Sequence, residues 1–154
     1  MTPDELICRP AALQDLPDII DLLGDDVLGR ARNPAYADGA SAYDAAFHQM
    51  LGNPDNTVIV GTIAGKIVGC YQITFIRGLS HKGALRAQVE SVRIASASRG
   101  AGLGGVMMRD AIHRARDRGA NILQLTTDQR RPHTRRFYER LGFVASHTGM
   151  KLAL

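Results

Sequence analysis

A run of seven residues, Arg99 to Gly105, contains four glycines and lies between an apolar, strand-like stretch and a helical pattern. Glycine has no side chain, so it lets the chain turn tightly and leaves backbone N–H groups unshielded. At the start of a helix, such N–H groups point together at a bound anion. The run therefore predicts a phosphate-binding loop, and it favours a ligand that carries a pyrophosphate.

Two familiar phosphate-binding motifs do not fit this run. A Walker A loop requires Lys-Ser or Lys-Thr after its last glycine, whereas Gly105 is followed by Val106. The order Gly100-x-Gly102-x-x-Gly105 matches the dinucleotide fingerprint, but that motif expects an acidic residue at the end of the next strand. The next strand-like segment ends in Thr126-Thr127, and Asp128 comes too late. Neither a nucleoside-triphosphate site nor a dinucleotide site is favoured.

Hydrophobic periodicity predicts an alternating chain of strands and helices around one mixed sheet. Apolar, β-branched runs on both sides of Gly65 predict a hairpin, and a long strand leads into the glycine run. Strands are expected at residues 7–9, 57–64, 66–76, 84–94 and 122–126, with two short strands closing the chain. Helices are expected at 13–23, from a capping-box pattern at Ser41–Asp44, after Leu103 and at 132–141, while 24–39 mixes loop and short helix.

Three separated segments carry a resemblance to a known family. Val92-Arg93-Ile94 is followed by Arg99-x-x-Gly102-x-Gly104, the C-terminal part contains Phe137-Tyr138-Glu139-Arg140-Leu141-Gly142-Phe143, and the chain opens with Ile7-Cys8-Arg9-Pro10-Ala11 before Asp15. In this order and spacing, the three segments span nearly all of the 154 residues. They resemble the acyl-CoA signature, the C-terminal motif and the first strand of the GNAT superfamily of acyl-CoA-dependent N-acyltransferases.

The resemblance implies a single α/β (α+β) domain over residues 1–154, with about six to seven strands and about four helices. Two parallel strands would splay apart, and acetyl-CoA would lie in the gap as cosubstrate. The residues expected to bind it are Val92, Arg93, Ile94, Arg99, Gly100, Ala101, Gly102, Leu103, Gly104, Gly105, Arg131 and Tyr138. A backbone N–H near Ile94 would meet the thioester oxygen.

Amine acetylation requires a base, because an acceptor amine with a pKa of about 10.4 is protonated at neutral pH. Arg86, Gln88 and Glu90 alternate with apolar residues on the strand before the glycine run, which places three polar groups on one face. Glu90 is the best carboxylate for the role, acting directly or through a water, with Gln88 orienting the substrate or water. The alternative for Glu90 is a buried salt bridge to an arginine such as Arg86.

Tyr138 is where the superfamily commonly carries its general acid. A phenol with a pKa of about 10 stays protonated until the basic CoA thiolate forms. The alternative is a core tyrosine that hydrogen-bonds the cofactor. The sequence departs from the family nearby, since Arg131 stands where an asparagine is frequent and Thr134 where an alanine is frequent. Arg131 is thus a candidate phosphate contact, and the neighbouring arginines either form a solvated helix face or attract the anionic cofactor.

Composition narrows the function further. A chain that is 45% hydrophobic can bury one substantial core, no segment is apolar enough to span a membrane, and the acidic N-terminus is unlike a signal peptide, so a cytoplasmic location is expected. Cys8 and Cys70 suit reduced thiols. The histidines have no metal-ligand spacing, and 5% aromatic content does not favour nucleic-acid binding.

These observations predict an N-acetyltransferase that moves acetyl from acetyl-CoA to the primary amine of a small-molecule acceptor by direct attack. Direct attack is favoured because no cysteine is placed as an acyl carrier. A protein N-terminal or lysine acetyltransferase is an alternative that needs an open peptide groove, which residues 24–39 could form or close. A catalytically silent acyl-CoA sensor is the other alternative, and a homodimer is an expectation. The identity and charge of the acceptor stay open.

Overall fold

The computed structural model describes residues 2–25, 27–30, 33, 35–130 and 132–153. Arg131, one of the predicted cofactor-binding residues, lies outside the described residues. The chain divides into two compact units, Met1–Gln124 and Leu125–Leu154, and each is described by itself.

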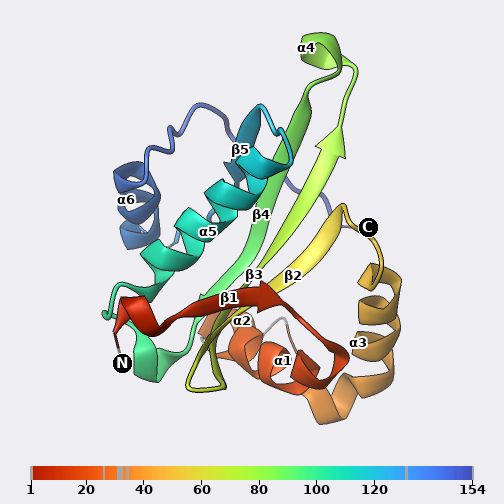
Figure 1. Ribbon diagram of the computed structural model, residues 1–154, viewed down its shortest axis with the longest axis vertical. Coiled ribbons are helices and arrows are strands. Elements are labelled where there is room, and N and C mark those ends of the chain that lie inside the picture. Colours follow the sequence, from red (N-terminus) through yellow and green to blue (C-terminus); the bar gives the residue numbers. More distant parts are fainter. Residues whose placement is uncertain (1, 26, 31–32, 34, 131, 154) are drawn as a thin grey trace. The chain divides into compact units, whose positions relative to one another are not determined.

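The predicted α/β class is confirmed: one mixed five-stranded sheet, in the order β1-β2-β3-β4-β5, is accompanied by helices (Figure 1). The strands are β1 (Ile7–Pro10), β2 (Asn56–Ile63), β3 (Lys66–Arg77), β4 (Leu85–Ile94) and β5 (Ile122–Leu125). The helices are α1 (Leu16–Gly24), α2 (Val27–Arg30), α3 (Tyr36–Met50), α4 (Ser80–Gly83), α5 (Leu103–Asp117) and α6 (Pro132–Arg140), with short 3-10 turns at Pro3–Glu5, Leu13–Asp15 and Ser96–Ser98.

The predicted hairpin is confirmed, because β2 and β3 pair antiparallel on either side of Gly65. β4 then pairs antiparallel with β3, and β1 with β2. Backbone and side-chain bonds join Asn121 to Leu85 and Gln124 to Gln88, so contacts between β5 and β4 advance in the same direction along both strands. That is the pattern of parallel neighbours, as the sequence predicted.

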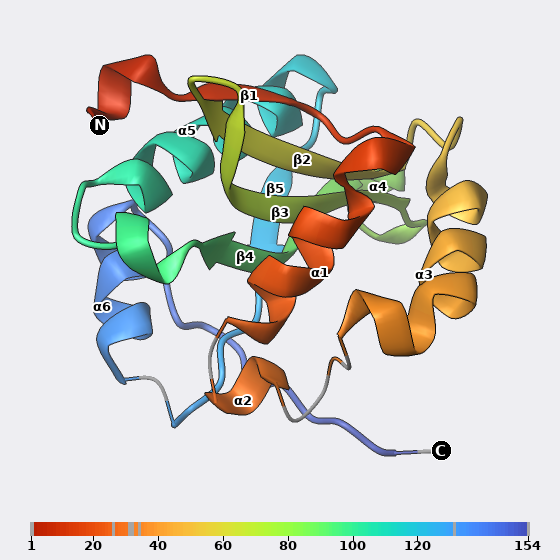
Figure 2. The same ribbon diagram turned by 90° about the horizontal axis from the view of Figure 1, so that it is seen from below.

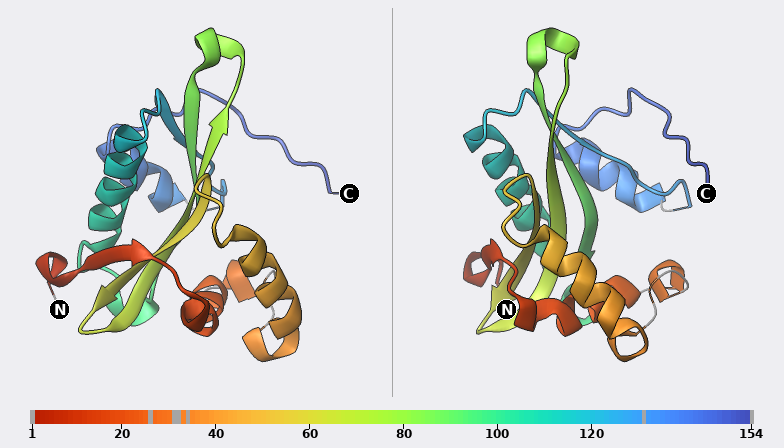
Figure 3. Two further views of the ribbon diagram at one scale, coloured as in Figure 1. Left: turned by 45° about the vertical axis from the view of Figure 1, so that its right-hand side comes forward. Right: turned by 90° about the vertical axis from the view of Figure 1, so that its right-hand side faces the viewer.

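α1 packs on one face of the sheet and α5 on the other (Figures 2 and 3). Side chains alternate between faces along a strand, so paired Val60 and Cys70 face one side while paired Gly61 and Gly69 face the other. Val60 and Cys70 pack with Ile19 and other apolar residues of α1. α5 packs on the glycine side.

The two glycines make room for a methionine of α5. A Cβ atom at Gly69 would lie 2.7 Å from the Met107 sulfur and 2.8 Å from the Arg93 carbonyl oxygen, and a Cβ at Gly61 would lie 3.1 Å from the same sulfur. Met107 itself is 0% exposed. The missing side chains thus let α5 approach the sheet closely, and Leu103 at its start packs with Ile63 and Val68.

A polar network also joins α5 to the sheet. The buried Tyr71 hydroxyl donates to Asp110 of α5, and Arg114 Nε donates to the same carboxylate oxygen at 2.8 Å. Arg114 Nη2 continues to the Cys8 carbonyl of β1 at 3.3 Å. Burial and the Asp110 hydrogen bond raise the pKa of Tyr71, so its phenol stays protonated and donating.

The start of α1 depends on an ion pair. Arg9 of β1 donates two hydrogen bonds to the Asp15 carboxylate, at 2.6 and 2.9 Å, and the Ala12 N–H donates a third. The hydrogen bonds from Arg9 are the main reason that the pKa of Asp15 is lowered, with the Ala12 N–H adding to the effect. This buried carboxylate therefore stays charged and fixes the turn from β1 into α1.

Three sequence predictions about elements were wrong. The helix expected from Ser41 begins earlier, at Tyr36, and kinks at Gly39, and the Tyr36 hydroxyl donates a hydrogen bond of 2.8 Å to Asp44, which lies beyond the kink. Residues 143–153 form no strand in the part of the chain that the structure describes, although two short strands were expected there. The sheet consequently has five strands, not six or seven.

The glycine contact supplies a stability test. Gly69→Ala is expected to lower the free energy of unfolding by about 1–3 kcal/mol, because the new methyl group overpacks the Met107 sulfur and the Arg93 carbonyl. Gly78→Ala is the matched control, since a Cβ there meets nothing within 4 Å. Urea unfolding midpoints measure both variants. Equal midpoints for the two variants would show that α5 does not depend on this close approach.

Candidate functional site

The predicted glycine loop forms as expected between the short turn at Ser96–Ser98 and α5. Gly100 and Gly102 have φ values of +82° and +79°, in the left-handed region that favours glycine. Gly102 is the N-cap of α5 and makes no side-chain cap hydrogen bond, and the first turn of the helix contains no acidic residue. No capping side chain or acidic residue of this turn therefore offsets the positive end of the helix dipole, and this arrangement suits a bound anion.

Arg99 shapes this loop through an ion pair that the sequence did not predict. Its Nε donates to the Ile94 carbonyl at 3.0 Å, and its Nη2 donates to the Asp25 carbonyl at 2.9 Å and contacts the Asp25 carboxylate at 3.4 Å. The same carboxylate accepts the Ser96 N–H at 2.6 Å. Asp25 thus ties the end of α1 to both ends of the turn that precedes the glycines.

The other predicted loop residues either pack in the core or belong to the first turn of α5. Leu103 is buried in the core, so only its backbone can face a ligand. Ala101 and Ile94 pack partly against the same core cluster. Gly104 and Gly105 fall in the first turn of α5, where the Gly105 N–H bonds to the Gly102 carbonyl at 3.0 Å.

A β-bulge interrupts β4 just before the loop. Cys70 pairs with Arg93 and Gln72 with Glu90, so two residues of β4, Ser91 and Val92, stand opposite one residue of β3. Ser91 has a φ of +54°, which is uncommon for a residue with a side chain. The extra residue reverses the alternation of faces, so Glu90 lies on the α1 side while Ile94 lies over Gly69 on the α5 side.

Glu90 is exposed and, among the residues that the structure describes, has no hydrogen-bond or ion-pair partner. The alternative of a buried salt bridge to Arg86 is therefore wrong, since both side chains are exposed. The predicted alternation along β4 is confirmed: Leu85, Ala87 and Val89 are buried, and the polar side chains face the other way.

Amide side chains form a row beside Glu90. Glu90 pairs across the sheet with Gln72, and Gln88 pairs with Thr74. Gln72 Nε2 donates to Asn56 Oδ1 at 2.8 Å, and Gln124 Nε2 donates to Gln88 Oε1 at 2.8 Å. This polar row continues across four strands on the face opposite α5.

Tyr138 belongs to the second unit, on α6. It is buried and makes edge-to-face contacts with Phe137 and Phe143, whose ring centroids lie 5.1 and 5.7 Å from its own. The Phe143 N–H donates to the Tyr138 carbonyl at 3.1 Å, and Gly142 takes the left-handed conformation with a φ of +92°. The predicted helix ending before Gly142 is confirmed, and the Phe-Tyr-x-x-x-Gly-Phe segment forms its C-terminal cap.

The described residues offer no metal site, no membrane-spanning helix and no activated cysteine. Within the described residues, no cluster of three or more His, Cys, Asp or Glu side chains could hold a metal ion. Among the described helices, none combines the length and apolarity of a transmembrane span. Cys8 and Cys70 are free, and burial raises their pKa values to about 11 and about 12, so neither is an activated nucleophile.

The fold matches solved structures over nearly its whole length. A transcriptional regulator from Bacillus halodurans C-125 is 42% identical, with a TM-score of 0.93 over 97% of this chain and 99% of that chain. A protein from Agrobacterium tumefaciens strain C58 is 30% identical, with a TM-score of 0.85 over 96% and 99%. Glucosamine-6-phosphate N-acetyltransferase from Arabidopsis thaliana shares the fold at 18% identity, with a TM-score of 0.79 over 96% and 97%.

The family comparison agrees with this architecture. No curated protein matches the sequence. The model of the Acetyltransferase (GNAT) family matches residues 20–143, which include β4, the glycine loop, α5 and the Phe-Tyr segment. This chain belongs to the GNAT acetyltransferase family.

Proposed function

We propose that the protein transfers an acetyl group from acetyl-CoA to the primary amine of a small molecule. The observation that carries this proposal is the arrangement around the β4 bulge. An exposed, unpartnered carboxylate at Glu90 faces one side, and the chain continues from the end of the strand through the Ser96–Ser98 turn and the glycine loop to an uncapped helix N-terminus. A candidate base for an amine and a candidate phosphate-binding loop thus belong to one continuous segment, from Glu90 on β4 to Gly105 in the first turn of α5.

The glycine loop fits the pyrophosphate of CoA. Gly100, Gly102 and the first turn of α5 offer backbone N–H groups, with no capping side chain or acidic group to compete with an anion. Arg99 is engaged with Asp25 and Ile94, so its proposed role is to hold the loop in shape. A role for Arg131 in contacting a phosphate stays a prediction.

Glu90 is proposed to accept the proton that the amine must lose. The free amine then attacks the thioester carbonyl carbon, a C–N bond forms, and the C–S bond breaks. A backbone N–H near Ile94 is proposed to stabilise the oxyanion, as the family resemblance implies. Gln88 and Gln72, which flank Glu90 on the same face, would orient the amine or a bridging water.

Tyr138 is proposed to return a proton to the leaving thiolate. A phenol suits this step because it stays protonated at neutral pH and donates only to a strong base. Its ring is fixed by Phe137 and Phe143, so the hydroxyl has a defined direction within its unit. The competing hypothesis is that Tyr138 only hydrogen-bonds the cofactor.

The small-molecule acceptor is favoured over a protein acceptor by one similarity of fold. The Arabidopsis thaliana structure with this architecture is an N-acetyltransferase of an amino sugar phosphate. A second candidate function is regulation without turnover, which the name of the 42% identical Bacillus halodurans protein favours. An exposed Glu90 argues for turnover, since a silent sensor needs no base. Cytoplasmic location, the lack of a nucleic-acid partner and a homodimer stay predictions.

The central experiment measures thiol release from acetyl-CoA by the purified protein across small amines, amino acids, amino sugars and short peptides. A rate well above hydrolysis without acceptor would establish the enzyme and its acceptor class. Tight acetyl-CoA binding with no acceptor-dependent release would favour the regulatory candidate and overturn the proposed transfer.

Gly105→Asp separates anion binding from folding. An acidic residue in the first turn of α5 complements the helix dipole, so the melting temperature should stay equal or rise. The same charge should repel the CoA pyrophosphate and weaken acetyl-CoA binding at least tenfold. Gly105→Asn is the matched neutral control. Calorimetric titration with acetyl-CoA gives the affinities, and unchanged affinity in the Asp variant would place the phosphates elsewhere.

Glu90→Gln tests the base. Its kcat should fall about 100-fold or more at neutral pH, the usual scale of general-base catalysis, while the KM for acetyl-CoA stays unchanged. Raising the pH toward the amine pKa should recover part of the loss, because the acceptor then arrives deprotonated. Arg86→Gln is the control, because Arg86 lies four residues earlier on the same face of β4. A Glu90→Gln variant with normal kcat across pH would exclude the base role.

Tyr138→Phe tests the acid. The ring contacts with Phe137 and Phe143 are kept, so folding should be preserved while only the hydroxyl is lost. A fall in kcat with unchanged acetyl-CoA affinity is expected. Weakened acetyl-CoA binding with normal turnover would instead identify Tyr138 as a cofactor-binding residue.

A further inference from the structure

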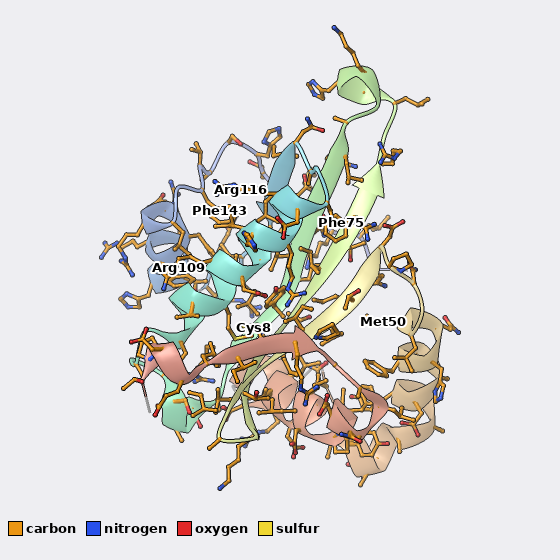
Figure 4. All side chains as sticks on the ribbon, in the orientation of Figure 1. Cys8, Met50, Phe75, Arg109, Arg116 and Phe143 are labelled. Atoms are coloured by element: carbon orange, nitrogen blue, oxygen red, sulfur yellow. The ribbon has the colours of Figure 1, made fainter. Side chains whose placement is uncertain are left out.

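A groove of about 320 Å³ lies between the end of α3, the end of β1 and the start of β2. Its lining residues share a lack of charge: Pro10, Ala11, Phe47, Met50, Leu51, Gly52, Asn53, Pro54, Asn56, Thr57 and Val58. This volume is at the lower end of the range for small-molecule sites, which begins at about 300 Å³. Met50, labelled in Figure 4, ends α3 at this groove.

The groove opens on the same sheet face as Glu90. Val58 of the groove pairs with Gln72, and Gln72 pairs with Glu90, so the three residues form one row across β2, β3 and β4. Paired residues of neighbouring strands point to the same face, and strands lie about 4.8 Å apart. The Glu90 position is therefore about 10 Å from the wall of the groove.

A hydrogen-bonded amide pair spans the distance between them. Gln72 Nε2 donates to Asn56 Oδ1 at 2.8 Å, and the Thr74 hydroxyl donates to the same oxygen at 3.4 Å. Asn56 also lines the groove. An acceptor molecule lying along this row would meet a carboxylate, then amide groups, then an apolar surface.

We infer that the groove is a subsite for an apolar group of the amine acceptor, whose amino nitrogen lies at Glu90 about 10 Å away. The inference rests on the proposed function, because it places the acceptor amine at the proposed base. The occupant is an aromatic ring or a branched aliphatic group. A phosphate or carboxylate is disfavoured at this end of the acceptor, since no lining residue carries a charge to neutralise it.

The apolar lining of the groove also predicts which acceptor amines the protein should prefer. Apolar groups gain affinity by leaving water, whereas a polar group of equal size would lose hydrogen bonds there. An amine with a terminal ring should therefore have a kcat/KM at least tenfold above that of the same amine without the ring. A spacer that together with its ring spans about 10 Å should be optimal, and shorter ones should lose the advantage.

The test compares phenylbutylamine with butylamine on the wild-type protein, Leu51→Glu and Leu79→Glu. Leu51 lines the groove and is 44% exposed, whereas Leu79 is 98% exposed at the tip of the β3–β4 hairpin and serves as the control. Leu51→Glu should abolish the preference for phenylbutylamine and leave the KM for acetyl-CoA and the kcat/KM for butylamine unchanged. Met50→Glu is a second groove variant, in case Leu51→Glu fails to fold.

Binding of phenylbutylamine, followed by calorimetry without acetyl-CoA, separates the two hypotheses. If no amine is acetylated but phenylbutylamine still binds the wild type and Leu79→Glu at least tenfold more tightly than Leu51→Glu, the proposed function fails and the apolar subsite stands. Equal binding and equal kcat/KM in all variants would overturn the subsite. A change of oligomeric state in the groove variants by sedimentation would also overturn it, because the groove would then be a contact between copies.

Discussion

The contact between the Met107 sulfur and the paired glycines Gly61 and Gly69 determines how close α5 lies to the sheet. That closeness fixes where α5 begins, because Leu103 at its first position is locked into the core with Ile63 and Val68. The glycine loop can only run from the end of β4 to that point. Two missing side chains in a hairpin thus position the N-terminus of a helix that is distant in the sequence.

Local patterns in the sequence were sufficient to predict most of the helices and strands. The β2–β3 hairpin, the long β4 strand, α5 and α6 follow from period and glycine placement, and all are present. The start of α3 was missed because a capping-box pattern at Ser41 resembles a true helix start, while the Tyr36–Asp44 bond that extends the helix joins residues a full two turns apart. The two closing strands were predicted but do not form among the described residues, where apolar side chains such as Val144 and Met150 are 82% and 92% exposed and so form no buried strand face.

The site was predicted in part, and what was missed is long-range. The glycine loop and the shared face of Arg86, Gln88 and Glu90 could be derived from spacing alone, whereas the exposure of Glu90 could not. The bond from Asp25 to Ser96 and Arg99 joins segments more than 70 residues apart, so no local signal indicates it. The bulge at Ser91 has no sequence signature either, since serine is not a residue that favours a positive φ. The apolar groove depends on α3, whose boundaries the sequence did not fix.

The bulge in β4 accommodates one residue more than regular pairing with β3 allows. One extra residue stands between Glu90 and Ile94, so the two side chains lie on opposite faces of the sheet although they are four residues apart. Deleting Ser91 would remove the bulge and let β4 pair regularly with β3, with Glu90 still opposite Gln72 and Ile94 still opposite Gly69. The pairing with β3, not the bulge itself, therefore places Glu90 and Ile94 on opposite faces, and the consequence of the bulge is local: Ser91 takes a φ of +54°, and Ser91 and Val92 share one position opposite β3.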